Sequence, residues 1–356
     1  MKKTPSLGDV AQRAGVSAAT VSRIARGQLG VDAAIQARVR RAAAELGLDL
    51  DQRRNGTSTI IAFLLSNRDV LHSFQARILA GAEAYCASQE KELLFMSLRY
   101  SPTVPPEALH LPQILRRRHL VRAVILGGTN SPNMLAALRE QKIPFAVLGN
   151  NVVGDWRPEE FDTVYSDDVQ GAFDLTSGLI ADGHRDIWFI GDIGLPWYAR
   201  CAEGYRQSML NAGLLPRLSE IQSDDRRLGY LATRSILSRR DPVSAIFAGS
   251  DQIARGVYEA LYQSGLSVPD DISVAGFNDT EAALLHPPLT SVAEFPEELG
   301  RHLAGFALRR AQEPDREPQK LIIPTRVVVR ESTKPMTPRS LALAEPRVDP
   351  PVVSEV

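Results

Sequence analysis

The residues between 17 and 28 combine side chains that bind phosphate groups and the edges of bases. Hydroxyl-bearing residues and arginines alternate here with small and apolar residues, and the expected exposed set is Ser17, Thr20, Ser22, Arg23, Arg26 and Gln28. Hydroxyl and guanidinium groups bind phosphate oxygens, and an arginine can bond both major-groove acceptors of a guanine. The pattern therefore favours contact with DNA, although a solvated basic face on a small helical lobe would have the same composition.

The segment before these residues predicts a short amphipathic helix. One helical face carries four apolar residues at positions i, i+3, i+4 and i+7, namely Leu7, Val10, Ala11 and Ala14. Ser6 and Asp9 have the spacing of a capping box at the helix start. Gly15 can end the helix, because glycine adopts the left-handed backbone conformation without steric cost.

Two further helices are predicted after this glycine turn, the first capped by Ser17 and the second by Asp32. Their inward faces would be formed by Val21, Ile24 and Ala25, and by Ile35, Val39, Ala42, Ala43 and Leu46. This is the helix-turn-helix order, in which the second helix lies in the major groove. The predicted DNA contacts are Ser6, Ser17, Ala18, Ala19, Thr20, Ser22, Arg23 and Arg26.

The charge of the chain is unevenly divided. Residues 1–57 hold 10 Lys and Arg against 5 Asp and Glu, whereas the whole chain of 356 residues has a formal net charge of −1. A basic head on an acidic body is expected of a protein with one end that binds nucleic acid.

The composition is that of a water-soluble globular protein with two or three domains, with 44% hydrophobic and 23% charged residues. No apolar run is long enough for a membrane span, and the first residues have no apolar stretch typical of a secretory signal. Cys86 and Cys201 have no metal-binding spacing and fit reduced thiols. We therefore expect a cytoplasmic protein without a metal or cofactor.

Beyond the head, buried strands alternate with helices in two series. The first series has strands at 59–65, 92–98, 123–128 and 144–149, with helices near 74–90, 107–119 and 131–141. The second has strands at 186–192, 245–251 and 272–279, with helices near 169–182, 198–213, 227–239 and 251–265. This alternation predicts an α/β core of two doubly wound parallel-sheet lobes with a cleft between them.

The motifs resemble those of the LacI/GalR family of bacterial transcriptional regulators. The segment DVAQRAGVSAATVSR resembles the signature of its head, and the likeness continues through AGAEAY, YSDDVQGA, GHRDIWFIGD, EGYRQSM, AIFAGSDQIARGV, VPDDISVAGFNDTE, PPLTSV and RVVVRES. The resemblance implies a helix-turn-helix head and a core like periplasmic sugar-binding proteins. It also implies a homodimer that binds an operator in double-stranded DNA, more often as a repressor than as an activator, under the control of a small effector.

This resemblance divides the chain into four parts. They are a head at 1–47, a short linker at 48–58, a two-lobed core for effector binding and dimerisation at 59–332, and a disordered tail at 333–356. It also implies that segments 290–296 and 320–326 cross between the lobes, so that neither lobe is one continuous piece of chain.

The chain departs from the family pattern in the linker and in the recognition helix. The linker lacks the Pro-Asn pair and the Ala-Arg-x-Leu run of a hinge helix, so we expect little kinking of the operator. Ala18 and Ala19 stand at positions that vary with the operator, where alanine can contact only a thymine methyl. Arg23 is therefore the main candidate for reading a base directly.

Ligands of open α/β sheets bind outside the carboxyl ends of the strands. The predicted strands end in small or polar residues, so we expect an effector cleft that includes Ser66, Asn150, Ser250, Asp251 and Asn278. The aromatic residues Phe74, Trp197 and Tyr198 could stack on a sugar or another flat ligand, or pack in the core.

The resemblance also bears on the effector cleft. The sugar-clamping arginine of the family falls on Cys201, with Arg200 one residue earlier, and its hydroxyl-binding aspartate falls on Asn278. Glu294 matches a position that contacts effector. The usual charged pair is therefore missing, which weakens the expectation of a simple sugar. Three alternatives stay open: compensation by Arg200 with Asp279 or Asp251, a modified or less hydroxylated ligand, and a degenerate cleft in a constitutive regulator.

Two other functions are alternatives to transcriptional regulation. An enzyme of α/β fold would need a catalytic motif, and no glycine-rich nucleotide loop, nucleophile elbow or zinc-binding helix motif is present. His184, between Gly183 and Arg185, fits helix capping better than catalysis. A small-molecule or sugar-binding module without a DNA role would leave the basic head unexplained.

Overall fold

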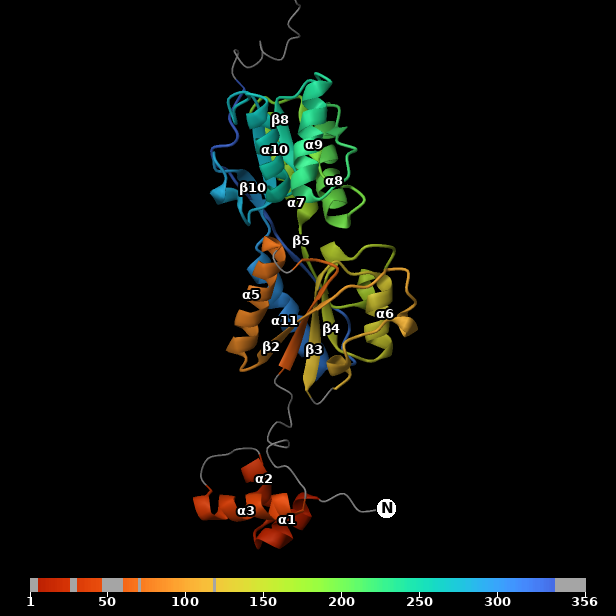
Figure 1. Ribbon diagram of the computed structural model, residues 1–356, viewed down its shortest axis with the longest axis vertical. Coiled ribbons are helices and arrows are strands. Elements are labelled where there is room, and N and C mark those ends of the chain that lie inside the picture. Colours follow the sequence, from red (N-terminus) through yellow and green to blue (C-terminus); the bar gives the residue numbers. More distant parts are fainter. Residues whose placement is uncertain (1–5, 26–30, 47–59, 70–71, 118–119, 337–356) are drawn as a thin grey trace, which may run out of the picture.

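The computed structural model describes residues 6–25, 31–46, 60–69, 72–117 and 120–336. Within these ranges the chain forms a three-helix head and two α/β lobes stacked along the long axis of the core (Figure 1). The predicted linker at 48–58 lies outside the described residues. None of the helices in the described part of the chain is long and apolar enough to cross a membrane.

The head consists of α1 (Leu7–Ala14), α2 (Ala18–Ala25) and α3 (Ala33–Glu45). The predicted capping box between Ser6 and Asp9 is formed, and Gly15 ends α1 with a φ of 65°. Asp32 accepts hydrogen bonds from two amides of the first turn of α3. The predicted apolar faces meet in one small core that includes Val10, Val21 and Val39, all fully buried.

The first lobe is a six-stranded sheet in the order β11-β5-β4-β3-β1-β2. Its strands are β1 (Ile60–Ser66), β2 (Glu92–Leu98), β3 (Val121–Gly128), β4 (Phe145–Leu148), β5 (Thr163–Ser166) and β11 (Lys320–Ile323), and each neighbouring pair is parallel. One face packs on α5 (Ser73–Ser88) and α11 (Pro296–Gln312), and the other on α6 (Pro132–Glu140). A parallel sheet covered on both faces explains the continuous apolar runs of its central strands.

The second lobe repeats this plan with the order β12-β10-β9-β8-β6-β7. Its strands are β6 (Ile187–Ile190), β7 (Arg217–Leu218), β8 (Ala245–Ala248), β9 (Ser273–Asn278), β10 (Thr290–Ala293) and β12 (Arg326–Val328), of which β12 is antiparallel to β10. The helices α7 (Asp168–Ala181) and α8 (Pro196–Asn211) cover one face, and α9 (Asp225–Ser238) and α10 (Asp251–Gln263) cover the other.

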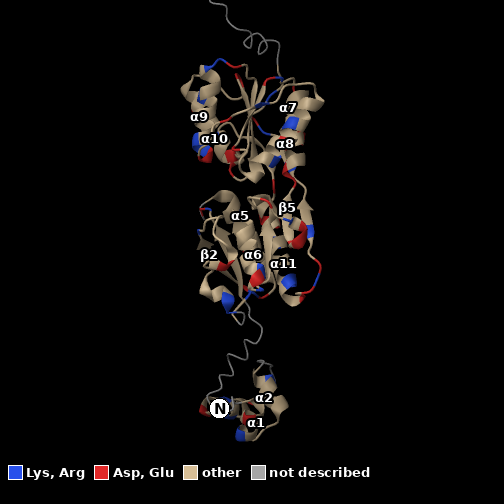
Figure 2. Ribbon diagram, turned by 90° about the vertical axis from the view of Figure 1, so that its right-hand side faces the viewer, with Lys and Arg blue, Asp and Glu red and all other residues tan. Residues whose placement is uncertain are grey.

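The chain passes between the lobes three times. The crossings lie between β5 and α7, between β10 and α11, and between β11 and β12. The expectation that segments 290–296 and 320–326 cross back is confirmed. Acidic residues occur along the segments that join the lobes (Figure 2), among them Asp168 and Glu294.

Two sequence-based expectations differ from the structure. The helix predicted at 107–119 is replaced by two short 3-10 turns, Pro106–Ala108 and Gln113–Arg116. Pro112 lies inside the predicted helix and lacks the amide donor that a continuous helix needs there, so the apolar residues of this segment are buried from turns instead.

Residues 333–336, the first four of the predicted disordered tail, contact the second lobe. The amide of Met336 donates to the carbonyl of Asp182 at 2.7 Å, and the Lys334 ammonium pairs with Asp270. Residues 337–356 lie outside the described residues. His184 does not cap a helix: its buried ring contacts Ser244 Oγ through Nδ1 and the Lys334 carbonyl through Nε2, both at 3.1 Å, and so holds this last segment.

Candidate DNA-binding surface and effector cleft

The outer face of α2 carries small residues and one arginine. Ala18, Ala19 and Arg23 are exposed, whereas Val21 and Ile24 are buried against the other two helices. An exposed recognition-helix face that presents a guanidinium is the arrangement needed to reach base edges in a major groove.

Two hydroxyls order the start of this helix. Ser17 Oγ accepts a hydrogen bond from the Thr20 amide at 3.1 Å and lies 2.8 Å from Thr20 Oγ1. The turn is further held by a salt bridge of 2.9 Å from Arg13 of α1 to Glu45 of α3. Ser6 is used in the capping box of α1, and Arg26 lies outside the described residues.

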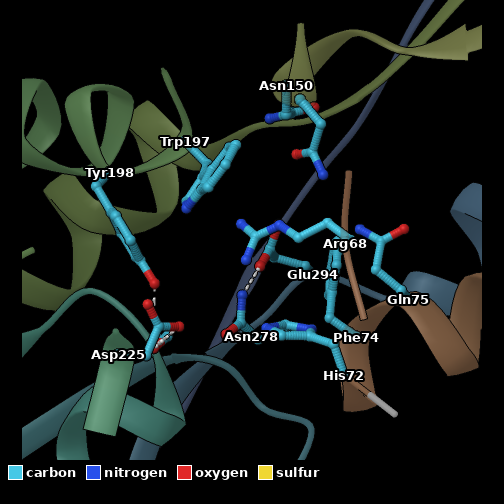
Figure 3. Close-up of a pocket in the computed structure, with 12 residues that line it drawn as sticks. Arg68, His72, Phe74, Gln75, Asn150, Trp197, Tyr198, Asp225, Asn278 and Glu294 are labelled. Atoms are coloured by element: carbon cyan, nitrogen blue, oxygen red, sulfur yellow. Dashed lines mark hydrogen bonds between the residues drawn. The ribbon is translucent and has the colours of Figure 1, made fainter. Parts of the chain in front are cut away.

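A cleft lies between the two lobes of the core (Figure 3). Twelve residues line it: Arg68, His72, Phe74, Gln75, Asn150 and Asn151 from the first lobe, Trp197, Tyr198, Asp225, Ser250 and Asn278 from the second, and Glu294 from a crossing. The cavity that these side chains enclose has a volume of about 30 Å³. The cleft is therefore narrow, and a sugar-sized ligand needs side chains or lobes to move apart.

An arginine and a tryptophan meet across this cleft. The guanidinium carbon of Arg68 lies 4.4 Å from the centre of the Trp197 ring, and Arg68 Nε donates to Thr129 Oγ1 at 3.2 Å. A guanidinium over an indole is an attractive cation–π pair. The Arg68 guanidinium therefore covers one face of the Trp197 ring, which the sequence suggested for ligand stacking.

A buried polar cluster closes the back of the cleft where two crossings meet. Ser166 Oγ lies 2.5 Å from Asp168 Oδ1 and 2.7 Å from Glu294 Oε1. Asn150 donates to Asp168, and Asn278 donates to Glu294. Burial, reinforced by the nearby Asp168, raises the pKa of Glu294 to about 8. Burial also raises the pKa of Asp168, although Arg200 acts in the opposite direction.

Two family models match the chain. The model described as bacterial regulatory proteins of the lacI family matches residues 6–48, and the model described as a periplasmic binding protein-like domain matches residues 176–333. The transcriptional regulator CelR of Thermobifida fusca is 30% identical over 346 residues, which cover 93% of this chain and 99% of the relative.

The chain belongs to the LacI family of bacterial transcriptional regulators. The ribose operon repressor of Escherichia coli (strain K12) is 29% identical over 89% of this chain and 96% of its own length. The relatives are regulators of transcription rather than enzymes.

Solved structures of this family share the fold. A CelR–cellobiose complex covers 92% of this chain and 99% of that chain, with a TM-score of 0.68 and 30% identity. The lac repressor dimer bound to operator and an anti-inducer covers 93% and 100%, with a TM-score of 0.71 and 23% identity, a likeness that concerns the fold alone.

Six of the ten effector residues expected in this LacI-family regulator line the cleft: Phe74, Asn150, Trp197, Ser250, Asn278 and Glu294. Several of their polar groups are already engaged within the protein. The Asn150 amide contacts Ser166 and Asp168, and Ser250 caps α10 through the Ile253 amide. Less of the polar lining is therefore available to a ligand than its composition indicates.

The other four expected residues lie outside the lining. The Arg200 guanidinium pairs with Asp168 at 3.4 Å and lies over the Tyr165 ring, so it does not swing into the place expected for a clamp. Cys201 packs in the apolar core of the second lobe. Ser66 is buried at the end of β1.

Asp251, the fourth of these, has a structural task. Its carboxylate accepts hydrogen bonds from the amides of Thr280, Glu281 and Ala282 and from Ser291 Oγ. It therefore holds the loop after β9.

Sequence reasoning missed several lining residues, namely Arg68, His72, Gln75, Asn151 and Asp225. His72 and Asp225 stand at or near helix starts, which is where an open α/β sheet places ligand-binding groups. Arg68 follows β1 by two residues, and its position after a strand end was the signal available for it.

Proposed function

We propose that this LacI-family regulator binds a pseudo-palindromic operator as a homodimer, represses transcription there, and changes its operator affinity when a small effector enters the interlobe cleft. The observation that carries the proposal is the presence in one chain of an exposed α2 face and a cleft whose walls belong to two lobes joined by three crossings. A head without a cleft, or a cleft without a head, would support a simpler binding function.

The DNA contacts follow from the exposure of α2. Ala18, Ala19 and Arg23 present the outward face, with Ser17, Thr20 and Ser22 beside them. The related lac repressor structure is a dimer on its operator, which supports the same arrangement here. Two-fold symmetry then requires two half-sites about one helical turn apart.

The effector we propose is carbohydrate-derived. The lining combines ring faces from Phe74 and Trp197 with amide and carboxyl groups from Asn150, Asn278 and Glu294, a mixture suited to a sugar ring and its hydroxyls. The relatives also support a carbohydrate effector, since a CelR structure is a complex with cellobiose and another relative is a ribose operon repressor.

Operator release tests both halves of the proposal. Footprinting of the full chain upstream of its own gene identifies the site, and a chain lacking residues 1–57 serves as the control that should bind no DNA. Sugars are then added one at a time to the bound complex. A footprint weakened by one sugar supports the proposal, and a variant Asn278→Ala should raise the sugar concentration required.

The narrowness of the cleft favours a second candidate, a constitutive repressor with a degenerate cleft. In that case the footprint would form but no small molecule would alter it or raise the melting temperature of the core. Loss of any footprint would count against both candidates.

A further inference from the structure

Arg68 brings a positive charge to the cleft without a carboxylate partner. Among the described residues, no carboxylate oxygen lies within 4.0 Å of its guanidinium nitrogens, and its one hydrogen bond runs from Nε to Thr129. The two terminal nitrogens, with four N–H groups, have no hydrogen-bond partner among the described residues. A guanidinium fork that keeps its terminal donors open is suited to a carboxylate or phosphate.

The acidic groups of the cleft are engaged elsewhere. Glu294 bonds Ser166 and Asn278, and its raised pKa of about 8 keeps it protonated at neutral pH. Asp225 accepts a hydrogen bond from Ser250 Oγ at 3.2 Å. Neither carboxyl group therefore neutralises Arg68 at close range.

Two helix ends add to the positive potential. The first turns of α5 and α8 both enter the cleft lining, one from each lobe, and neither helix has a side-chain cap or an acidic residue in its first turn. By contrast, α9 and α10 begin with a side-chain cap and an aspartate. Uncapped helix N-termini favour a bound anion, because their amide groups are unpaired and the helix dipole is positive there.

A neutral histidine stands at the start of α5. Burial, then the charge of Arg68, lowers the pKa of His72, and its buried Nδ1 has no hydrogen-bond partner among the described residues. His72 also lines the cleft, close to Arg68 in Figure 3. It offers one further polar contact to a group that binds beside the guanidinium.

We infer that the effector is an anionic carbohydrate, a sugar that carries a carboxylate or a phosphate, and that Arg68 binds its charged group. The inference rests on the proposed effector function of the cleft and names the class of ligand. The anion takes the open donors of the guanidinium, and the sugar ring replaces Arg68 against Trp197 or lies beside it. Neutral sugars leave the charge of Arg68 unpaired and bind more weakly.

Calorimetry on the full chain tests this with compounds of one carbon skeleton. The panel is glucose, gluconate, glucuronate and glucose 6-phosphate, with cellobiose added because a relative binds it. At least one charged compound should bind the wild type more tightly than glucose and cellobiose. The two sugar acids and the sugar phosphate distinguish carboxylate from phosphate as the recognised group.

Variants at Arg68 test whether its guanidinium binds the charged group of the ligand. Arg68→Gln should lower the affinity for the charged ligand roughly 10–100-fold, because a charge-assisted pair is lost. The affinity for neutral sugars should change little. Arg68→Lys keeps the charge without the fork and should give an intermediate loss. The matched control is Arg122→Gln, which removes an exposed arginine near the start of β3, at the opposite end of the same sheet.

The two levels of the proposal fail in different ways. If only glucose or cellobiose binds, or if Arg68→Gln leaves a charged ligand unaffected, the inference about Arg68 is wrong while the effector cleft stands. If no compound of the panel binds, the carbohydrate effector proposed above fails, and the inference fails with it.

Discussion

Asp168 and Glu294 lie on either side of a single hydroxyl group, that of Ser166, at 2.5 Å and 2.7 Å. A hydroxyl has one proton to donate, so it cannot donate to both carboxyl groups. The second short contact requires a proton on one of them, and the raised pKa of Glu294 assigns it there. Because the three residues belong to two of the crossings, this proton lies at the junction of the lobes.

The stability of the core should therefore fall as the pH rises. Between about 4.5 and about 8, folded Glu294 keeps a proton that the unfolded chain has lost, so the unfolded state is favoured by increasing pH. The slope approaches roughly 1.4 kcal/mol per pH unit within this window. Glu294→Gln should flatten it, measured as the melting temperature by calorimetry between these pH values. The exposed Glu220→Gln is the control, and an equal slope in Glu294→Gln would show that Glu294 is ionised in the folded protein.

Arg23→Ala should weaken binding at the specific operator by roughly 1–3 kcal/mol if the guanidinium grips a guanine. Its effect on random DNA should be much smaller, and fluorescence anisotropy on both duplexes measures the difference. Arg38→Ala, which removes an exposed arginine from α3, is the matched control. Equal losses on both duplexes would mean that Arg23 contacts only phosphate.

Alanine substitutions at Gly8, inside α1, and at Gly15, which ends α1, should change the stability of the head in opposite directions. Gly15 has a φ of 65° and open space around it, so Gly15→Ala introduces backbone strain alone and should destabilise the head by about 1–2 kcal/mol. Gly8 lies inside the helix, where alanine should stabilise by roughly 0.5–1 kcal/mol. Thermal unfolding of the head followed by circular dichroism tests the pair, and the same sign for both would contradict the assignment of Gly15 as the helix stop.

The segment 333–336 should contribute to the stability of the second lobe. A chain ended at Ser332 loses the Lys334 carbonyl and so leaves the buried His184 ring one partner short, which costs about 1–3 kcal/mol. Comparison with a chain ended at Met336 isolates these four residues. The shorter chain should melt at a lower temperature by several degrees. Equal melting temperatures would show that the contacts of His184 and Met336 contribute nothing.

The head could be predicted from the sequence because its signals are local. Ser6 with Asp9, Gly15 and Asp32 each act on residues within one helical turn, and their caps are formed as expected. The helix predicted at 107–119 is wrong because the apolar spacing of this segment is helical, whereas Pro112 inside it interrupts the hydrogen bonds of a helix.

The cleft could be predicted only in part, for a physical reason. Strand ends indicated Asn150, Ser250 and Asn278, since the topology of a parallel sheet alone brings them together. The partners of each side chain depend on distant segments: Arg200 turns to Asp168, Asp251 to the loop after β9, and Arg68 to Trp197 of the other lobe. No pattern of spacing encodes such pairings.

The triple crossing has a consequence for the order in which the protein is made. The head is complete once Leu46 has been synthesised, whereas the first lobe waits for α11 and β11, and hence for Ile323. The lobe whose synthesis begins first is thus finished only after most elements of the second lobe have been made. Until Ile323 has been added, a nascent chain has the residues of the head but of no completed first lobe.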